Sequence, residues 1–419
     1  MGRFGCARGL NSSSPLTRSK EATTANECHI ASEWELSLQK VNLGVMHYDV
    51  IVLGVGGMGS AACFELARRG RRVLGLEQFP LVHDRGSSHG RTRIIRTAYY
   101  EHPTYVPLVR RAFERWFDLE QLSGKHLLTS CPCLSIGTRA SEVIRGVKQA
   151  ADEHRLAVEA LTADELRRHF PAFRFSDQYV GLLEQESGFL YVEECVRSHV
   201  DAACWLRADI RAEEPAVEWQ PEGSGVVVRT SKGTYHAGRL VITAGPWAAG
   251  LLGRYGARLS VMRQVPMWFA TEDDRLFRRD RFPIFIADTP AGAFYGFPVI
   301  DADGLKVARH YGAPELSFPA DVSRAVSDDD EVPIRRFLVE HLPQASRARR
   351  RASVCIYTLS PDRHFIIDVH PEHPQVALAA GFSGHGFKFA SVVGEVLADL
   401  AEKGTTELPM EMFRMGRFS

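Results

Sequence analysis

The sequence predicts an α/β fold, more finely an α+β arrangement, in which a Rossmann-type nucleotide-binding domain carries a second domain inserted between its segments. Three observations predict it. A buried strand, a glycine-rich turn and an amphipathic helix follow one another between residues 49 and 69. A second buried strand then ends in an acidic residue. Two more apolar strands lie far along the chain, at residues 239–245 and 376–381, so the domain is expected to be assembled from separated segments.

The first of these segments has the order strand, helix, strand. Residues 49–53 form a nearly continuous apolar run, which is typical of a strand buried on both faces. Residues 58–69 follow a helical period with alanines and Leu66 on one side and charged residues on the other, and Gly70 is expected to end this helix. Residues 72–77 predict the second strand. The chain therefore opens with a βαβ unit.

The turn between the first strand and the helix has the sequence GVGGMG, which matches the dinucleotide-binding pattern GxGxxG. Gly54 would permit the tight turn, Gly56 would let the backbone approach a pyrophosphate, and Gly59 would let the helix pack on the strand. The helix N-terminus offers free N–H groups to the phosphates. Glu77 ends the second strand, where an acid would bind ribose hydroxyls. The motif predicts a dinucleotide cofactor but does not distinguish FAD from NAD.

The remaining periodicity suggests how the domains are divided. Helices are expected at residues 140–154, 162–169 and 389–400. We expect the cofactor-binding domain to comprise residues 46–130, 190–250 and 350–419. The inserted substrate-binding domain would then comprise residues 131–189 and 251–349.

Composition excludes several classes of function. Of 419 residues, 45% are hydrophobic and 24% are charged, as in ordinary globular proteins. Lys plus Arg equals Asp plus Glu at 51 each, so no global charge favours nucleic acid or an anionic membrane. No apolar run is long enough to span a bilayer. We therefore expect a soluble protein with neither a nucleic-acid nor a membrane partner.

The eight cysteines are scattered, and the one close pair, Cys131 and Cys133, fits neither a zinc-ribbon nor a thioredoxin spacing. We expect mostly buried, reduced thiols in a cytoplasmic protein, and no metal site.

Residues 1–45 show no strand or helix period. They are interpreted as a disordered extension, or as sequence upstream of a natural start at Met46, rather than as a transit peptide.

The stretch after Glu77 resembles the signature of a known enzyme family. Residues 86–96 (GSSHGRTRIIR) closely resemble the GS-x-HG-x-TR-x-IR signature of the monomeric sarcosine oxidase and N-methyltryptophan oxidase family. Five later stretches resemble the family in the same order: 295–298 (YGFP), 304–306 (GLK), 353–358 (SVCIYT), 364–368 (HFIID) and 381–389 (GFSGHGFKF). The resemblance extends from about Tyr48 to the C-terminus. It implies an FAD-dependent amine oxidase of DAO-like fold, with a substrate domain built on a mixed β-sheet.

The resemblance also implies a covalent cofactor. Cys355 is similar in position to the family cysteine whose sulfur bonds to the 8α-methyl carbon of FAD. A tether of this kind would keep the flavin bound on dilution. The alternative is a buried structural thiol, which is the commonest role of a cysteine.

Arg96 and Lys388 resemble the pair of residues that binds the substrate carboxylate in this family. A carboxylate that enters a dry pocket needs compensating positive charge, and an arginine offers a planar fork. Lys388 stands among glycines and aromatic residues rather than in a polar stretch, which argues against a surface lysine.

Lys306 resembles the family lysine beside the flavin that promotes reaction with oxygen. A fixed cation would stabilise the superoxide anion formed by the first electron transfer. A solvated strand lysine is the alternative. His310, Tyr295 and Tyr357 are similar to family residues that line the active-site pocket.

Arg93 and His89 resemble residues on the flavin side of the site, where positive charge would stabilise the reduced, anionic flavin, although His89 could equally be a turn residue.

Three positions depart from the family pattern: Ser88 replaces a frequent histidine, Arg91 replaces a frequent aspartate, and Arg309 adds charge beside His310. These departures affect the expected substrate more than the reaction class.

The implied reaction is oxidative demethylation of sarcosine, or of a similar small secondary amino acid, with oxygen as acceptor and glycine, formaldehyde and hydrogen peroxide as products. Alternatives within the enzyme class are an N-methyltryptophan or pipecolate oxidase and a dehydrogenase that uses an electron carrier. A flavoprotein without turnover is the alternative outside it. The family resemblance implies a monomer.

Overall fold

The first large sheet is built around β1 (His47–Leu53), whose last four residues are buried. β1 pairs in parallel with β2 (Val73–Leu76) on one side and with β12 (Thr234–Ile242) on the other. β22 (His373–Ala380) extends the parallel pairing beyond β12. Parallel strands covered on both faces require apolar side chains on both sides, which explains why these segments are continuously hydrophobic. The structure is a computed structural model that describes residues 47–418.

Eight strands form this sheet, and the remaining ones lie at its edges. One edge strand pairs with β2, a hairpin pairs with the first part of β12, and an antiparallel strand pairs with β22. These strands are β9 (Asp209–Arg211), β10 (Ala216–Glu222), β11 (Gly225–Thr230) and β21 (Ile366–His370).

Four helices pack together beside this sheet and form the largest hydrophobic core with it. They are α1 (Gly57–Arg68), α2 (Tyr105–Ser123), α5 (Val192–Trp205) and α8 (Ala390–Lys403). The central helix α1 is buried along most of its length and contacts both α5 and α8. A short helix, α6 (Ala248–Leu251), follows β12.

A second eight-stranded sheet is mixed, because β5 and β15 are parallel whereas the other pairs are antiparallel. Its order is β19-β14-β17-β16-β15-β5-β7-β6. The strands are β5 (Cys133–Thr138), β6 (Val158–Leu161), β7 (Tyr179–Glu184), β14 (Met267–Phe269), β15 (Ile284–Thr289), β16 (Gly292–Phe297), β17 (Leu305–His310) and β19 (Arg349–Ala352).

Three helices accompany the second sheet: α3 (Glu142–His154), α4 (Ala163–His169) and α7 (Asp328–His341). The core here is rich in phenylalanine. Phe294 of β16 stacks on Phe337 of α7, with ring centroids 4.4 Å apart. Such large rings bury much apolar area and hold the helix against the sheet.

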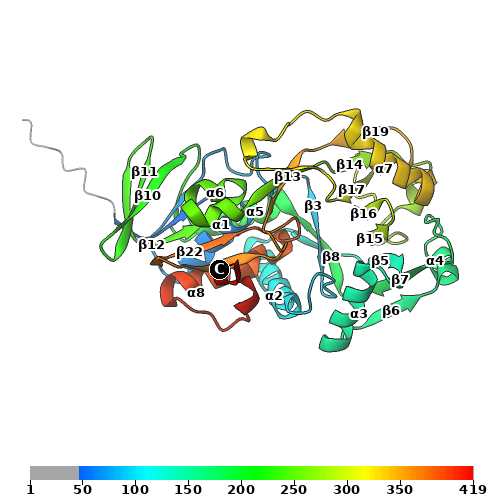
Figure 1. Cartoon of the computed structure of the whole chain (residues 1–419), viewed down its shortest axis with the longest axis horizontal. Helices are drawn as coiled ribbons and strands as arrows, with labels where there is room; N and C mark the ends of the chain where they lie inside the picture. The colour runs from blue at the N-terminus through cyan, green and yellow to red at the C-terminus, as the bar shows by residue number, and fades with distance from the viewer. Residues whose placement is uncertain (1–46, 419) are drawn as a thin grey trace, which may run out of the picture. The chain divides into compact units, whose positions relative to one another are not determined.

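Two three-stranded sheets complete the fold. One contains β3 (Thr92–Arg96), β4 (Leu128–Ser130) and β8 (Ser187–Tyr191), and the other contains β13 (Ser260–Gln264), β18 (Glu315–Leu316) and β20 (Cys355–Leu359). Figure 1 shows β3, β8 and β13 between the strands of the two large sheets. β3 and β20 carry much of the candidate site.

The observed elements confirm the predicted α/β class and the opening βαβ unit, in which α1 occupies the predicted helix almost residue for residue. The predicted helices at 140–154, 162–169 and 389–400 are α3, α4 and α8. Residues 46–419 form one compact unit, so the division into a cofactor domain and a substrate domain stays a prediction. The interpretation of residues 1–45 lies outside the described part of the chain. Among residues 47–418, no helix combines the length and apolarity that crossing a bilayer requires.

Candidate active site

The glycine turn between β1 and α1 is packed so tightly that two of its glycines are obligatory. A Cβ on Gly59 would lie 1.8 Å from the carbonyl oxygen of Gly54. Gly54 has φ +89°, and a Cβ there would lie 2.7 Å from the carbonyl oxygen of Thr243. A Cβ on Gly56, in contrast, would meet only the Ser88 hydroxyl, at 3.8 Å. The open side of the turn at Gly56 is therefore the place where another molecule can approach the backbone.

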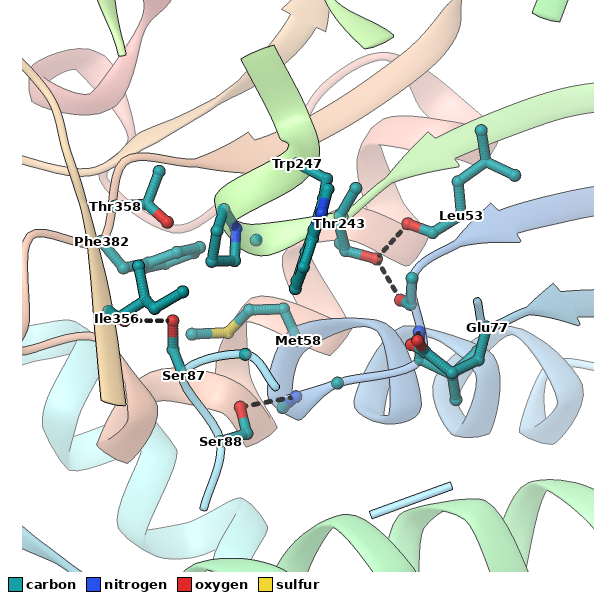
Figure 2. Close-up of a pocket in the computed structure, with 18 of the residues that line it drawn as sticks. Leu53, Met58, Glu77, Ser87, Ser88, Thr243, Trp247, Ile356, Thr358 and Phe382 are labelled. Atoms are coloured by element: carbon teal, nitrogen blue, oxygen red, sulfur yellow. Dashed lines mark hydrogen bonds between the residues drawn. The ribbon is translucent and has the colours of Figure 1, made fainter. Parts of the chain in front are cut away.

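A cavity of about 370 Å³ adjoins this turn. Figure 2 shows how its walls are fixed: Thr243 donates to the carbonyls of Leu53 (3.2 Å) and Gly54 (2.8 Å), and Ser88 accepts from the N–H of Gly57 (3.1 Å). α1 has neither a side-chain N-cap nor an acid in its first turn. Its N-terminus can therefore offer positive partial charge to an anion.

Glu77 lines the same cavity and is buried. Its carboxylate accepts hydrogen bonds from the N–H groups of Val55 (2.9 Å) and Phe79 (3.1 Å). These bonds leave lone pairs free to accept from the hydroxyls of a ligand. Gly54 and Gly56 line the cavity as well, whereas Gly59 lies behind the turn and makes the close packing of helix on strand possible.

Cys355, at the start of β20, is buried beside two basic residues. Its Sγ lies 3.8 Å from Nδ1 of His89 and 3.7 Å from Nη2 of Arg93. Burial alone would raise the pKa of this thiol, but His89, Arg93 and Lys306 together lower it to about 7. Nε2 of His89 is buried and has no hydrogen-bond partner within residues 47–418. An orphaned polar atom beside an activated thiol indicates that another group belongs at this position.

Lys306, on β17, is also buried. Its ammonium group donates to the carbonyls of Gly90 (2.7 Å) and Thr92 (2.9 Å) and to the Thr92 hydroxyl (3.1 Å). The rings of Phe297 and Trp268 lie 4.7 and 5.2 Å from Nζ. Burial, followed by the charge of Arg93, lowers the pKa of Lys306 well below its usual value. It is therefore not the solvated strand lysine considered as the alternative.

A second cavity, of about 70 Å³, contains six of the residues expected from the sequence: Arg93, Arg96, Tyr295, His310, Tyr357 and Lys388. They come from β3, β16, β17, β20 and the short segment before α8. Phe387 and Gly384 line both this cavity and the larger one, so the two adjoin. Lys306 lines neither.

Arg96 is already paired with a carboxylate. Its Nη2 lies 2.5 Å from Glu101, Nη1 donates to the carbonyl of Ala98 (2.7 Å), and the rings of Tyr99 and Tyr100 lie 4.3 and 4.6 Å from its guanidinium carbon. Both charged partners are largely removed from solvent, with side-chain exposures of 3% and 12%. Burial tends to raise the pKa of Glu101, but Arg96, His385 and Lys388 lower it to about 2.

Lys388 lies near this ion pair, and we call the part of the cavity lined by Arg96 and Lys388 the cationic corner. Its Nζ donates to the carbonyl of His385 (2.9 Å) and to the Tyr99 hydroxyl (3.2 Å). Burial and the nearby charge of Arg96 lower the pKa of Lys388 to about 7. Arg96 is thus a permanent cation, whereas Lys388 can take up a proton near neutral pH, so a second anion that arrives here would favour the charged form of Lys388.

The opposite wall is uncharged at neutral pH. Burial lowers the pKa of His310 to about 4 and raises those of Tyr295 and Tyr357. Nδ1 of His310 lies 3.2 Å from the Tyr357 hydroxyl. Of the residues that depart from the family pattern, Arg309 does not line the cavity, because alternation along β17 points it away from the side of His310.

Sequence reasoning missed Glu101, Tyr100 and His385, all of which line the small cavity. Glu101 stands five residues after Arg96, and nothing in its local sequence indicates that it is buried. The segment after β3 turns back on the strand, and this turn alone brings the two side chains together. Burial also lowers the pKa of His385, to about 3.

The six described cysteines are free, and five of them are buried, as expected for most of the thiols; Cys204 is exposed. Within residues 47–418, no group of three or more His, Cys, Asp or Glu side chains is arranged to hold a metal ion.

A nucleotide-sized cavity on a Rossmann-type glycine turn, adjoining a small pocket with buried cations, defines a dinucleotide-dependent oxidoreductase. Comparison with known proteins agrees: the family described as FAD dependent oxidoreductase, DAO, matches residues 49–400. The chain belongs to this DAO family. The predicted family and the predicted cofactor, FAD, are thereby confirmed.

Several named relatives are similar over most of their length. Monomeric sarcosine oxidase of Streptomyces avermitilis is 41% identical, over 87% of this chain and 96% of that protein. N-methyl-L-tryptophan oxidase of Salmonella agona is 36% identical, over 89% of this chain and all of that protein. Among solved structures, the open form of NikD, an unusual amino acid oxidase essential for nikkomycin biosynthesis, has a TM-score of 0.78 at 26% identity, covering 88% and 97% of the two chains.

Proposed function

We propose that the protein is an FAD-dependent oxidase of a small secondary amino acid, such as sarcosine, and that it uses oxygen as the electron acceptor. With sarcosine the products would be glycine, formaldehyde and hydrogen peroxide. The observation that carries this proposal is the small cavity that Arg96 and Lys388 line together and in which Arg96 pairs with a carboxylate. The similarity to sarcosine oxidases and N-methyl-L-tryptophan oxidases supports it.

The cationic corner supports a substrate with a carboxylate. Arg96 binds the Glu101 carboxylate through a charge-assisted hydrogen bond of 2.5 Å, which supports a site for this group. A substrate carboxylate would take the same donors as Glu101 moves aside. Lys388, with a pKa of about 7, would gain a proton and complete the pair of cations when the second carboxylate arrives.

Size favours a small amine. A cavity of about 70 Å³ holds roughly five water molecules at about 10–15 Å³ each. An N-methylated glycine is closer to this size than an amino acid that carries an indole ring. N-methyltryptophan and pipecolate remain the alternatives, because this chain is similar both to monomeric sarcosine oxidase and to N-methyl-L-tryptophan oxidase.

The remaining residues of the pocket favour the uncharged amine. Arg93, Arg96 and Lys388 disfavour a further cation nearby, and the opposite wall of Tyr295, Tyr357 and His310 supplies no anion. An amino acid would therefore lose its ammonium proton on entry and present a nitrogen lone pair. The two tyrosines stay protonated and can orient the amine by donating hydrogen bonds.

The cofactor site combines several matching groups. Gly54, Gly56 and the N-terminus of α1 would hold the pyrophosphate and Glu77 the ribose. Bound FAD would supply the two-electron acceptor for the amine. His89 and Arg93 would add positive charge beside its ring. Cys355 would hold the cofactor covalently, through a bond between its Sγ and the 8α-methyl carbon of FAD.

Lys306 is proposed to act on oxygen. It is the one buried lysine close to Cys355 and Arg93 among the described residues, and its side chain is held rigidly by three acceptors. A lysine that is already oriented needs little reorganisation, and negative charge that develops on oxygen would favour its protonated form. The proposal also includes the predicted division into a cofactor domain and a substrate domain, a monomeric state and a cytoplasmic location. The relatives named monomeric sarcosine oxidase support the monomeric state.

The proposed function is tested by anaerobic titration of the purified yellow protein with sarcosine, N-methyltryptophan, pipecolate, proline and primary amino acids. We expect sarcosine or another small secondary amino acid to bleach the flavin fastest, with peroxide released on admission of air. Fast bleaching by N-methyltryptophan alone would replace the proposed substrate class. A flavin that no amine reduces would refute the amine oxidase.

Glu101→Gln is expected to lower KM for a carboxylate-bearing amine, because the internal carboxylate no longer occupies the cationic corner. The change leaves Arg96 without its charge partner, so the free protein is expected to lose about 3–5 kcal/mol of stability in the absence of substrate. Steady-state kinetics and thermal unfolding, each with and without substrate, measure the two effects. Glu101→Asp keeps the charge and serves as the control. An increase in KM in the Gln variant would show instead that Glu101 holds Arg96 in position for the substrate.

A further inference from the structure

A third cavity, of about 250 Å³, adjoins Lys306. Lys306 lines this cavity, although it lines neither the cofactor cavity nor the amine cavity. The rest of the wall comes from the start of β3 and the residue before it, from the end of β8 and the first turn of α5, from β14, and from the turn between β16 and β17. It includes Arg91, Glu193, Glu194, Trp268, Ile300 and Asp301.

The inner end of this cavity reaches the proposed oxygen-reactive centre. Lys306 and Trp268 are each 3% exposed there. Lys306 donates to the carbonyl of Gly90, and a Cβ placed on Gly90 would lie 3.6 Å from Sγ of Cys355. A single strand of backbone therefore separates the ammonium group from the proposed attachment point of the cofactor.

The outer end reaches the surface. The side chains of Arg91 and Asp301 are 35% and 41% exposed, and Ile300 is 37% exposed. Arg91 forms ion pairs with Asp301 and, at 2.9 Å, with Asp303. These pairs join the loop before β3 to the β16–β17 turn across the opening. Arg91 is one of the positions that depart from the family pattern, and the structure gives it this role.

The residues of the wall favour oxygen over the amino acid, which is the other substrate of the proposed reaction. The wall carries Glu193, Glu194 and Asp301 against Arg91 and Lys306, and Arg91 is already paired with Asp301. The cavity therefore offers no free pair of cations to the carboxylate of an amino acid. Trp268, Pro298 and Ile300 offer an apolar surface that accommodates a small uncharged molecule without desolvation cost. The amine pocket has the opposite character, because its buried cations attract a carboxylate.

We infer that this cavity is a separate entrance by which molecular oxygen reaches Lys306, while the amino acid enters at Arg96 and Lys388. The inference rests on the proposed function of Lys306. In each turnover one oxygen molecule takes two electrons from the reduced cofactor and two protons, and it leaves as hydrogen peroxide. The two substrates then do not compete for one path.

The test fills the outer part of the cavity by Ile300→Trp and enlarges it by Ile300→Ala. Each holoenzyme is reduced anaerobically by the amine and then mixed with oxygen, so that the reductive and oxidative rates are measured separately. We expect the Trp variant to lower the second-order rate constant of reoxidation by about fivefold or more and to leave reduction by the amine unchanged, as for a blocked access path. The Ala variant is expected to keep or raise the reoxidation rate.

Crystals pressurised with xenon supply a readout that does not depend on activity. Xenon binds beside apolar side chains, so we expect its density against Trp268, Pro298 and Ile300 in the wild-type protein and a loss of that density in Ile300→Trp. Flavin content and thermal unfolding establish that the variants fold. If Ile300→Trp does not fold, Ile300→Phe replaces it as the variant that fills the cavity.

Three outcomes would overturn the inference. Unchanged reoxidation in a folded Trp variant, together with slow reoxidation in Lys306→Met, would remove the cavity as the oxygen path and leave the role of Lys306 intact. Unchanged reoxidation in Lys306→Met would refute the proposed role of the lysine itself. Slower reduction by the amine in the Trp variant would assign the cavity to the amino acid instead.

Discussion

Lys306→Met is expected to slow reoxidation of the reduced flavin by oxygen by about 10²–10³-fold, the range seen when a single oriented group that stabilises developing negative charge is removed. Reduction by the amine is expected to change little. Met has a similar length but no charge, so the packing against Phe297 and Trp268 is largely kept. Stopped-flow measurement of the two half-reactions separates the effects.

The chain offers a matched control for this substitution in its other buried lysine of the site. Lys388 is buried like Lys306, but it lines the amine pocket. Lys388→Met is expected to weaken amine binding and slow flavin reduction while reoxidation stays near the wild-type rate. Equal losses in both half-reactions of the Lys306 variant would contradict a specific role in oxygen chemistry.

Cys355→Ser is expected to abolish covalent attachment of FAD completely, because the serine hydroxyl is not appreciably ionised at neutral pH and does not replace the thiolate. Acid precipitation of the wild-type protein should leave yellow colour in the pellet, whereas the variant should release its flavin into the supernatant. Mass spectrometry of the intact chain measures the same difference as the mass of the bound cofactor.

Attachment to the apoprotein should also depend on pH. Basic neighbours lower the pKa of Cys355 to about 7, so the thiolate is the minor form below pH 7 and the major form above it. The rate of attachment is therefore expected to rise between about pH 6 and pH 8 and then level off. Cys195→Ser is the control, because burial raises the pKa of the Cys195 thiol well above its usual value. Flavin that stays bound to the denatured Cys355→Ser chain would show that another residue forms the bond.

Much of the cofactor site could be predicted because its signals are local. The apolar run of β1, the glycines of the turn and the period of α1 lie within residues 47–68, where strand and helix geometry follow from nearest neighbours along the chain. Cys355, Arg96, Lys306 and Lys388 were predicted by resemblance rather than by pattern, since single charged residues or thiols have no periodicity that distinguishes a site from a surface.

The sequence by itself determined the α/β class, the dinucleotide turn and the family. The tertiary structure decided which side chains meet. Glu101 pairs with Arg96 because the segment after β3 folds back, and Lys306 and His310 of β17 serve different cavities although four residues apart. Arg91 reaches Asp301 only because β3 and the β16–β17 turn, some 200 residues apart in the chain, are neighbours in space. Burial and charge at these meeting points set the pKa values of Cys355 and Lys388, and neither property is encoded in any short stretch of sequence.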